Sequence, residues 1–231
     1  MSNGAWEWAA LLDLLRALVA LERNDCARAR QQAGLAEVTS AKEGVLIRNR
    51  VTVFGRLVAG ACDAREGKLA DARALRDRQR SVANLSSLPE RWWVHALEGE
   101  IALASGDPAS AVAAYRSGEP PVKMYYGLGG ETGIITMIAQ SLILRDGIAR
   151  ASVAQGKLDD AIATYRRLLV VDRKSKWSPF FEPRYVLALA RLLDNAGRGD
   201  EAKAEYLRFL RYWKDADPGQ PELVEAIKRT R

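Results

Sequence analysis

A short pattern recurs five times along the 231-residue chain and limits its possible folds more than any other feature. Four copies run from a glycine to an alanine, at 67–72, 106–111, 156–161 and 197–202, and a degenerate copy lies at 24–29. Self-similarity at a period of a few tens of residues is typical of stacked helical repeats. Since such arrays mostly bind other molecules, the pattern favours a binding role over a catalytic one.

Small residues accompany this turn at fixed distances. The last alanines lie at 29, 72, 111, 161 and 202, and twelve residues before them stand Ala17, Gly60, Gly99, Ala149 and Ala190. Three copies carry a tyrosine four residues later, namely Tyr115, Tyr165 and Tyr206. Small side chains let two helices approach closely, and an aromatic ring one turn later fills the space between pairs. We therefore expect Ala111, Ala161 and Ala202 to be buried at helix crossings.

The pattern predicts five helix pairs followed by a short final helix. The pairs are expected at about 5–23 with 26–42, 45–66 with 69–84, 90–105 with 108–117, 133–155 with 158–174, and 183–196 with 200–214. A helix at about 221–230 should cover the apolar side of the last pair. Asp107 and Pro108 suit an N-cap and a first helical turn. The glycine- and proline-rich stretch 117–133 cannot hold a regular helix and explains the longest interval between repeats.

These repeats resemble the tetratricopeptide repeat (TPR) family over about residues 5–217. The resemblance implies an all-α, right-handed superhelical solenoid forming a single domain, with units at about 5–44, 45–89, 90–132, 133–182 and 183–217 and a capping helix. TPR units normally have about 34 residues, and these are longer. The ending Phe209-Leu210-x-x-Trp213-Lys214-Asp215-Ala216-Asp217-Pro218 is similar to C-terminal TPR regions of large bacterial signalling proteins, where such arrays follow a Ser/Thr kinase, a cyclase or a DNA-binding regulator module.

Composition restricts the partners and the compartment. No stretch of about 18 apolar residues occurs, which disfavours a transmembrane helix. The apolar segment 9–21 is interrupted by Asp13 and Arg16, so we interpret it as the first repeat helix rather than a signal peptide. Cys26 and Cys62 are too few for a disulfide scaffold, and we expect two buried, reduced thiols on neighbouring helices. A cytoplasmic location follows as the expectation.

Charge is spread along the chain rather than concentrated. The 35 basic and 29 acidic residues give a net charge of +6. Nucleic-acid binders gather positive charge on one face, and the best candidate stripe here is Arg73, Arg76 and Arg80. Solvated outer helix faces are the favoured interpretation of that stripe, and nucleic-acid binding is the least favoured function.

No arrangement typical of catalysis or of a cofactor stands out. His95 is the single histidine, and neither a catalytic triad nor zinc-ligand spacing is present. The run 127–131 is glycine-rich but lacks the lysine and hydroxyl residue of a phosphate-binding loop. We therefore predict a protein without enzymatic activity, resident metal or cofactor.

The resemblance implies that the first helix of each pair lines a concave groove. Helical phase then places Trp93 and Glu100 on its wall, with Arg150, Arg184 and Arg191 toward the C-terminal end. These arginines suit an acidic peptide or a carboxylate, although pairing within the chain is an equally weighted alternative. Tyr125 and Tyr126 add candidate aromatic contacts or fill a gap between units.

Three functions follow, in order of preference. The first is a protein–protein interaction module that binds a protein or peptide segment in the groove, with charge reversal at Arg184 and Arg191 expected to remove binding. The second is a domain that senses a small anionic effector, and the third is nucleic-acid binding. Self-association is left open.

Overall fold

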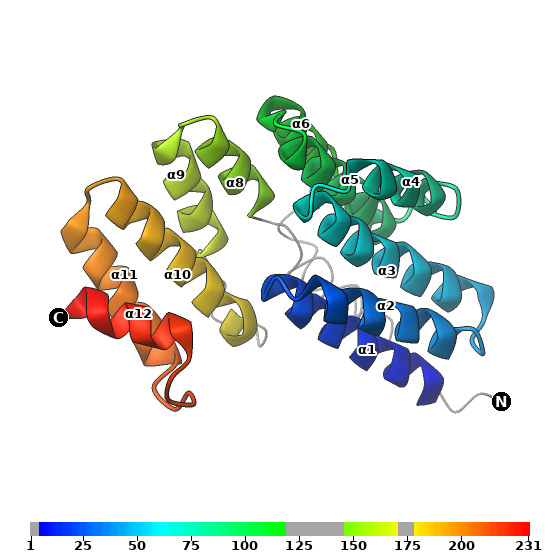
Figure 1. The fold of residues 1–231 in the computed structure, drawn as a ribbon, viewed down its shortest axis with the longest axis horizontal. Coiled ribbons are helices and arrows are strands. Elements are labelled where there is room, and N and C mark those ends of the chain that lie inside the picture. Colours follow the sequence, from blue (N-terminus) through cyan, green and yellow to red (C-terminus); the bar gives the residue numbers. More distant parts are fainter. Residues whose placement is uncertain (1–4, 119–145, 171–177) are drawn as a thin grey trace. The chain divides into compact units, whose positions relative to one another are not determined.

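The computed structural model describes residues 5–118, 146–170 and 178–231, and the regular structure in these ranges is α-helical throughout (Figure 1). The predicted all-α class is confirmed for them. Contacts divide the chain into two compact units, Met1–Gly147 and Ile148–Arg231, and each is described by itself. Helix labels follow Figure 1. The predicted loop beyond residue 118 and the first part of the predicted helix 133–155 lie outside the described residues.

The first unit contains the three helix pairs that the sequence predicts. They are α1 (Ala5–Glu22) with α2 (Cys26–Ser40), α3 (Val45–Arg65) with α4 (Leu69–Arg80), and α5 (Leu88–Ala104) with α6 (Pro108–Gly118). The first helices of successive pairs contact each other, because α1 packs against α3 and α3 against α5. The second helices α2 and α4 also contact the helix that follows each of them. Each pair therefore buries its apolar side on the next.

The second unit contains the helices of the C-terminal repeats and the final helix. They are α8 (Gly147–Ala154), which starts at the last residue of the first unit, α9 (Leu158–Leu168), α10 (Ser178–Asn195), α11 (Gly199–Tyr212) and α12 (Pro221–Thr230). α10 begins five residues before the predicted start at residue 183, with Pro183 inside it. A proline early in a helix removes one backbone hydrogen bond, and the chain continues through it here. The predicted final helix is confirmed and packs against α11.

The recurring turn is the same structure at each copy. Gly67, Gly106, Gly156 and Gly197 have φ angles of 77°, 76°, 72° and 73°, in the left-handed region. The next residue donates its backbone N–H five residues back, as from Lys68 to the carbonyl of Asp63 at 2.8 Å. The glycine itself donates its N–H three residues back, as from Gly67 to the carbonyl of Ala64 at 3.0 Å. These two hydrogen bonds close the C-terminus of a helix, and the left-handed backbone that they require favours glycine. Asn24 takes the same conformation, with φ of 56°, because asparagine tolerates it best among the other residues.

The small residues of the pattern lie where helices touch. A Cβ atom on Gly60 would lie 2.7 Å from Leu97 Cδ1, and one on Gly99 would lie 2.5 Å from the Tyr115 ring. The three predicted alanines and the three tyrosines are buried: Ala111, Ala161, Ala202, Tyr115, Tyr165 and Tyr206. The packing prediction is therefore confirmed.

Enlarging a side chain at one of these crossings should overpack it. Ala161 is fully buried in α9, so we expect Ala161→Leu to lower the free energy of unfolding by about 1–3 kcal/mol. Ala163→Leu, on the exposed face of the same helix, is the matched control and should change stability by less than about 0.5 kcal/mol. Denaturant unfolding followed by circular dichroism measures both. Equal midpoints for the two variants would contradict the assigned register.

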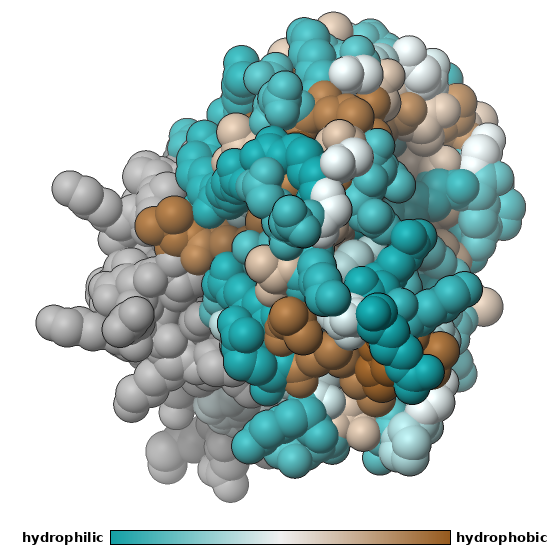
Figure 2. Space-filling model, turned by 90° about the vertical axis from the view of Figure 1, so that its left-hand side faces the viewer, coloured by the Kyte–Doolittle hydropathy of each residue, from teal (hydrophilic) through white to brown (hydrophobic). Residues whose placement is uncertain are grey.

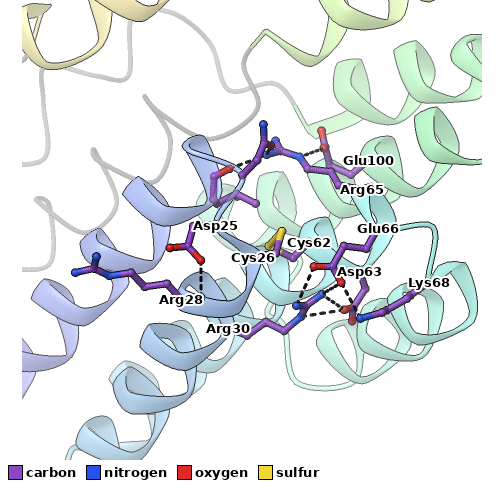
Figure 3. Close-up of a disulfide and its surroundings, with 12 residues drawn as sticks. Asp25, Cys26, Arg28, Arg30, Cys62, Asp63, Arg65, Glu66, Lys68 and Glu100 are labelled. Atoms are coloured by element: carbon purple, nitrogen blue, oxygen red, sulfur yellow. Dashed lines mark hydrogen bonds and ion pairs between the residues drawn. A yellow bond between two sulfur atoms is a disulfide. The ribbon is translucent and has the colours of Figure 1, made fainter. Parts of the chain in front are cut away.

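The two cysteines lie on neighbouring helices, as predicted, but they form a disulfide, and the expectation of reduced thiols is wrong (Figure 3). Cys26 is the first residue of α2 and Cys62 lies near the end of α3, with their Cα atoms 5.4 Å apart. That separation is within the range a disulfide spans. Counting cysteines cannot detect this, because the proximity arises from packing between two repeats.

An ion network joins the same two helices beside the disulfide (Figure 3). Arg30 of α2 contacts Asp63 at 2.7 Å and Glu66 at 2.5 Å, and Lys68 contacts Glu66 at 2.7 Å. Hydrogen bonds from Arg30 and then Lys68 lower the pKa of the Glu66 carboxyl from 4.5 to about 2. The last turn of α3 is thereby attached to α2 by a covalent bond at Cys62, and the turn after α3 is attached to α2 by the charged contact of Glu66.

Candidate functional site

Trp93, predicted to line the groove, lies in the core of the first unit. Its side chain is fully buried in α5 and meets the Phe54 ring edge-on, with centroids 5.3 Å apart and planes at 75°. A fully buried ring is not accessible to a partner. Trp93 therefore contributes to packing between α3 and α5.

Glu100, also predicted on the groove wall, is 3% exposed and is bound by the protein itself. The Tyr115 hydroxyl of α6 donates to its carboxylate at 2.5 Å, and Arg65 Nε of α3 lies 3.5 Å away. Figure 3 shows Arg65 extended toward Glu100. A buried carboxylate must be hydrogen-bonded to be tolerated, and this contact links three helices. Glu100 thus has a structural role.

Arg191 is engaged by the final helix. Glu225 of α12 accepts two-pronged hydrogen bonds from its guanidinium, with Nε at 2.8 Å from Oε1. These bonds lower the pKa of the Glu225 carboxyl. Arg229 of α12 also contacts Asp194, at 2.9 Å. Reversing the charge at Arg191 would therefore repel α12 as well as any acidic partner, so loss of binding in that variant would not by itself identify a groove.

The other residues predicted to line the groove lie partly inside and partly outside the described ranges. Arg184 and Arg191 lie two turns apart on α10, and the Arg184 guanidinium is 5.6 Å from the centroid of the Tyr185 ring. Arg150 is partly exposed on α8. Tyr125 and Tyr126 lie outside the described residues. A shared cationic surface formed by the three arginines stays a prediction.

The arginine stripe on α4 is largely paired. Arg76 contacts Asp77 at 2.8 Å and Arg80 contacts Glu98 at 2.5 Å. No group of three or more histidine, cysteine or acidic side chains among the described residues has the geometry to hold a metal ion. Among the described helices, none is both long and apolar enough to cross a bilayer.

An open groove over α1 and α2, which the repeat pattern does not indicate, is a candidate surface in the first unit. Its volume is about 360 Å³, and Leu12, Leu15 and Val19 form an apolar floor. Leu12 is 52% exposed and Val19 is 53% exposed. The opposite face of α1 is buried in the core through Leu11, Leu14, Leu18 and Leu21. We call this surface the α1–α2 groove.

Arginines form the rim of the α1–α2 groove. Arg16 contacts Asp13 at 3.0 Å, whereas the guanidinium groups of Arg23 and Arg28 make no ion pair within the described ranges. Figure 3 shows the Arg28 side chain pointing away from the disulfide. Asp25, which also lines the groove, accepts the backbone N–H of Arg28 at 3.1 Å and caps α2. The rim therefore carries a net positive charge.

A second apolar spacing in α1 could have revealed this groove. Trp8, Leu12, Leu15 and Val19 recur at steps of four, three and four residues, beside the buried leucines of the same helix. Such steps mark a seam along which another helix can pack. The repeat pattern involves only the buried face of α1 and therefore does not indicate this second seam.

Comparison with known proteins found no match to this chain among family models, curated proteins or solved structures.

Proposed function

We propose that the chain is a protein-interaction module, built as a right-handed TPR-like solenoid, whose α1–α2 groove binds an acidic amphipathic helix of a partner protein. The exposed apolar floor, with Arg23 and Arg28 beside it and without an ion pair in the described ranges, is the observation that carries this proposal. The recurring glycine turns and the contacts between successive first helices support the solenoid.

The floor favours a helical partner. α1 has apolar residues on two faces, although only one of them packs against α2 and α3. A surface helix normally presents a polar face to water, so a second apolar face indicates another covering element. The spacing of Leu12, Leu15 and Val19 matches the side-chain rows of a helix packed along α1.

The rim favours an acidic partner. Arg23 and Arg28 lie beside the apolar floor, and the nearby acidic groups already bind Arg16 and the start of α2. Glutamates flanking the apolar seam of a partner helix would meet these guanidinium groups. Such complementarity speeds association and selects the partner more than it raises affinity.

The test uses a synthetic helical peptide of about 18 residues, the length of α1, with leucine along one seam and glutamate on both sides of it. We expect this peptide to bind saturably in fluorescence anisotropy. A peptide with lysine in place of each glutamate should bind at least about tenfold more weakly. Leu12→Ser with Val19→Ser should remove binding, and Arg23→Glu with Arg28→Glu should reverse the preference for glutamate.

The control for the apolar change lies on the second unit. Figure 2 views the side of α9, α11 and α12, where apolar patches lie among hydrophilic residues. Val224 of α12 is 54% exposed, so Val224→Ser matches the loss of an exposed apolar side chain and should leave peptide binding unchanged. Unaltered affinity in both groove variants would refute the proposal. A dimer in sedimentation that Leu12→Ser converts to a monomer would assign the groove to a second copy instead.

A further inference from the structure

A second hollow in the first unit lies between α2, α3 and α4 and has a volume of about 280 Å³. None of its lining residues lines the α1–α2 groove. Its walls combine apolar side chains, including Leu75, with one carboxylate and one arginine from each of the three helices; the α2 arginine, Arg30, is already paired with Asp63 and Glu66. We call it the three-helix pocket. Its volume lies at the small end of ligand sites, so it suits a ligand of few atoms.

Gly34 opens one wall of the three-helix pocket. It lies in the middle of α2, where glycine is unfavourable relative to alanine. A Cβ atom on Gly34 would have no neighbouring atom within 4 Å, so packing does not require glycine there. Glycine in such a place permits close approach to the backbone, and the space in front of it belongs to the pocket.

Gly55 of α3 makes room for the carboxylate. A Cβ atom on Gly55 would lie 3.3 Å from Glu37 Oε1, so a larger residue would press on that group. Glu37 is half-buried and, within the described part of the chain, its carboxylate forms no hydrogen bond or direct ion pair. Burial raises the pKa of the Glu37 carboxyl, and the more distant charges of Arg56 and Arg78 oppose this. Its charge is therefore incompletely compensated.

Two guanidinium groups lie near this carboxylate without contacting it. Arg56 donates one N–H to the backbone carbonyl of Arg78, and an arginine has further donors to offer. The Arg78 guanidinium forms no ion pair in the ranges that the structure describes. A negative and a positive wall thus face the same small space, and neither is neutralised by direct contact.

We infer that the three-helix pocket binds a small zwitterion, a free α-amino acid, with its ammonium on Glu37 and its carboxylate on Arg56 and Arg78. A simple anion would be repelled by Glu37, and a simple cation would be repelled by the arginines. A molecule carrying both charges on neighbouring atoms satisfies both walls. Its side chain would lie against Ala33, Ala59 and Leu75.

Calorimetry of the full chain with each of the common free amino acids tests this inference, at concentrations up to about 10 mM. We expect at least one to bind saturably. Its N-acetyl derivative lacks the ammonium and its carboxamide lacks the carboxylate, and each should bind at least about tenfold more weakly. Absence of binding by every amino acid, or equal binding of both derivatives, overturns the inference.

Two variants locate the site. Gly34→Leu should fill the pocket and abolish binding, whereas Gln31→Leu, on the exposed face of α2, should bind as the wild type does. Glu37→Gln keeps the shape and removes the charge, and should weaken binding at least about tenfold without lowering the unfolding midpoint. Circular dichroism verifies the fold of each variant. Wild-type affinity in both Gly34→Leu and Glu37→Gln places the amino acid elsewhere and overturns the assignment. Peptide binding in the α1–α2 groove should persist in both, so the two proposals can fail separately.

Discussion

Trp93→Ala is expected to lower the free energy of unfolding by about 3–5 kcal/mol, the largest effect of any substitution considered. The side chain is fully buried and packs edge-on against Phe54, so its removal leaves a cavity between α3 and α5. Denaturant unfolding monitored by circular dichroism measures the change.

Trp8→Ala is the matched control for this prediction. Trp8 is 40% exposed on α1, so its removal leaves no enclosed cavity and should lower the free energy of unfolding clearly less than that of Trp93 does. The comparison also separates the two roles assigned to Trp93. If Trp93→Ala were as stable as Trp8→Ala, the ring would not be part of the core, and its predicted place on a binding wall would regain support.

Breaking the disulfide is expected to have the second largest effect. Cys26→Ala with Cys62→Ala should lower the free energy of unfolding by about 2–4 kcal/mol, because the bond restricts an unfolded loop that spans 36 positions. Guanidinium unfolding of the wild type and the double variant, with and without reductant, measures this.

Reductant provides the internal control. It should lower the wild-type midpoint and leave that of the double variant unchanged, since that variant has no thiol. A wild-type midpoint insensitive to reductant would mean that the two cysteines are not bonded in solution. The outcome also bears on the compartment, because cytosolic thiols are generally kept reduced. The cytoplasmic location stays a prediction.

The two proposed sites differ in what they require of the protein. The partner proposed for the α1–α2 groove is another macromolecule, and the groove is formed by a helix that is apolar on two faces. The three-helix pocket needs only side chains of α2, α3 and α4, and its volume suits a metabolite-sized ligand. Both use α2, whose first residue carries the disulfide. The bond therefore holds a helix shared by both sites against α3.

The periodic part of this structure could be predicted from the amino-acid sequence. The glycines at 67, 106, 156 and 197 end their helices because each adopts a left-handed backbone conformation. This requirement is local, since it depends on the φ angle of one residue. The alanines and tyrosines at fixed distances from each turn predicted the buried crossings, because helical periodicity converts spacing into direction.

The candidate sites depended on contacts between helices, which spacing alone does not contain. Helical phase placed Trp93 and Glu100 on an open wall, but α3 and α6 cover them. Helical phase also predicted that Arg191 faces a partner, but α12 packs back on α11 and its Glu225 binds Arg191. Cys26 and Cys62 are 36 positions apart, and only the packing of α2 on α3 brings them together. Local backbone preferences determine where each helix begins and ends. Burial and ion pairing of a side chain depend instead on which helix, distant in the sequence, packs against it in the folded protein.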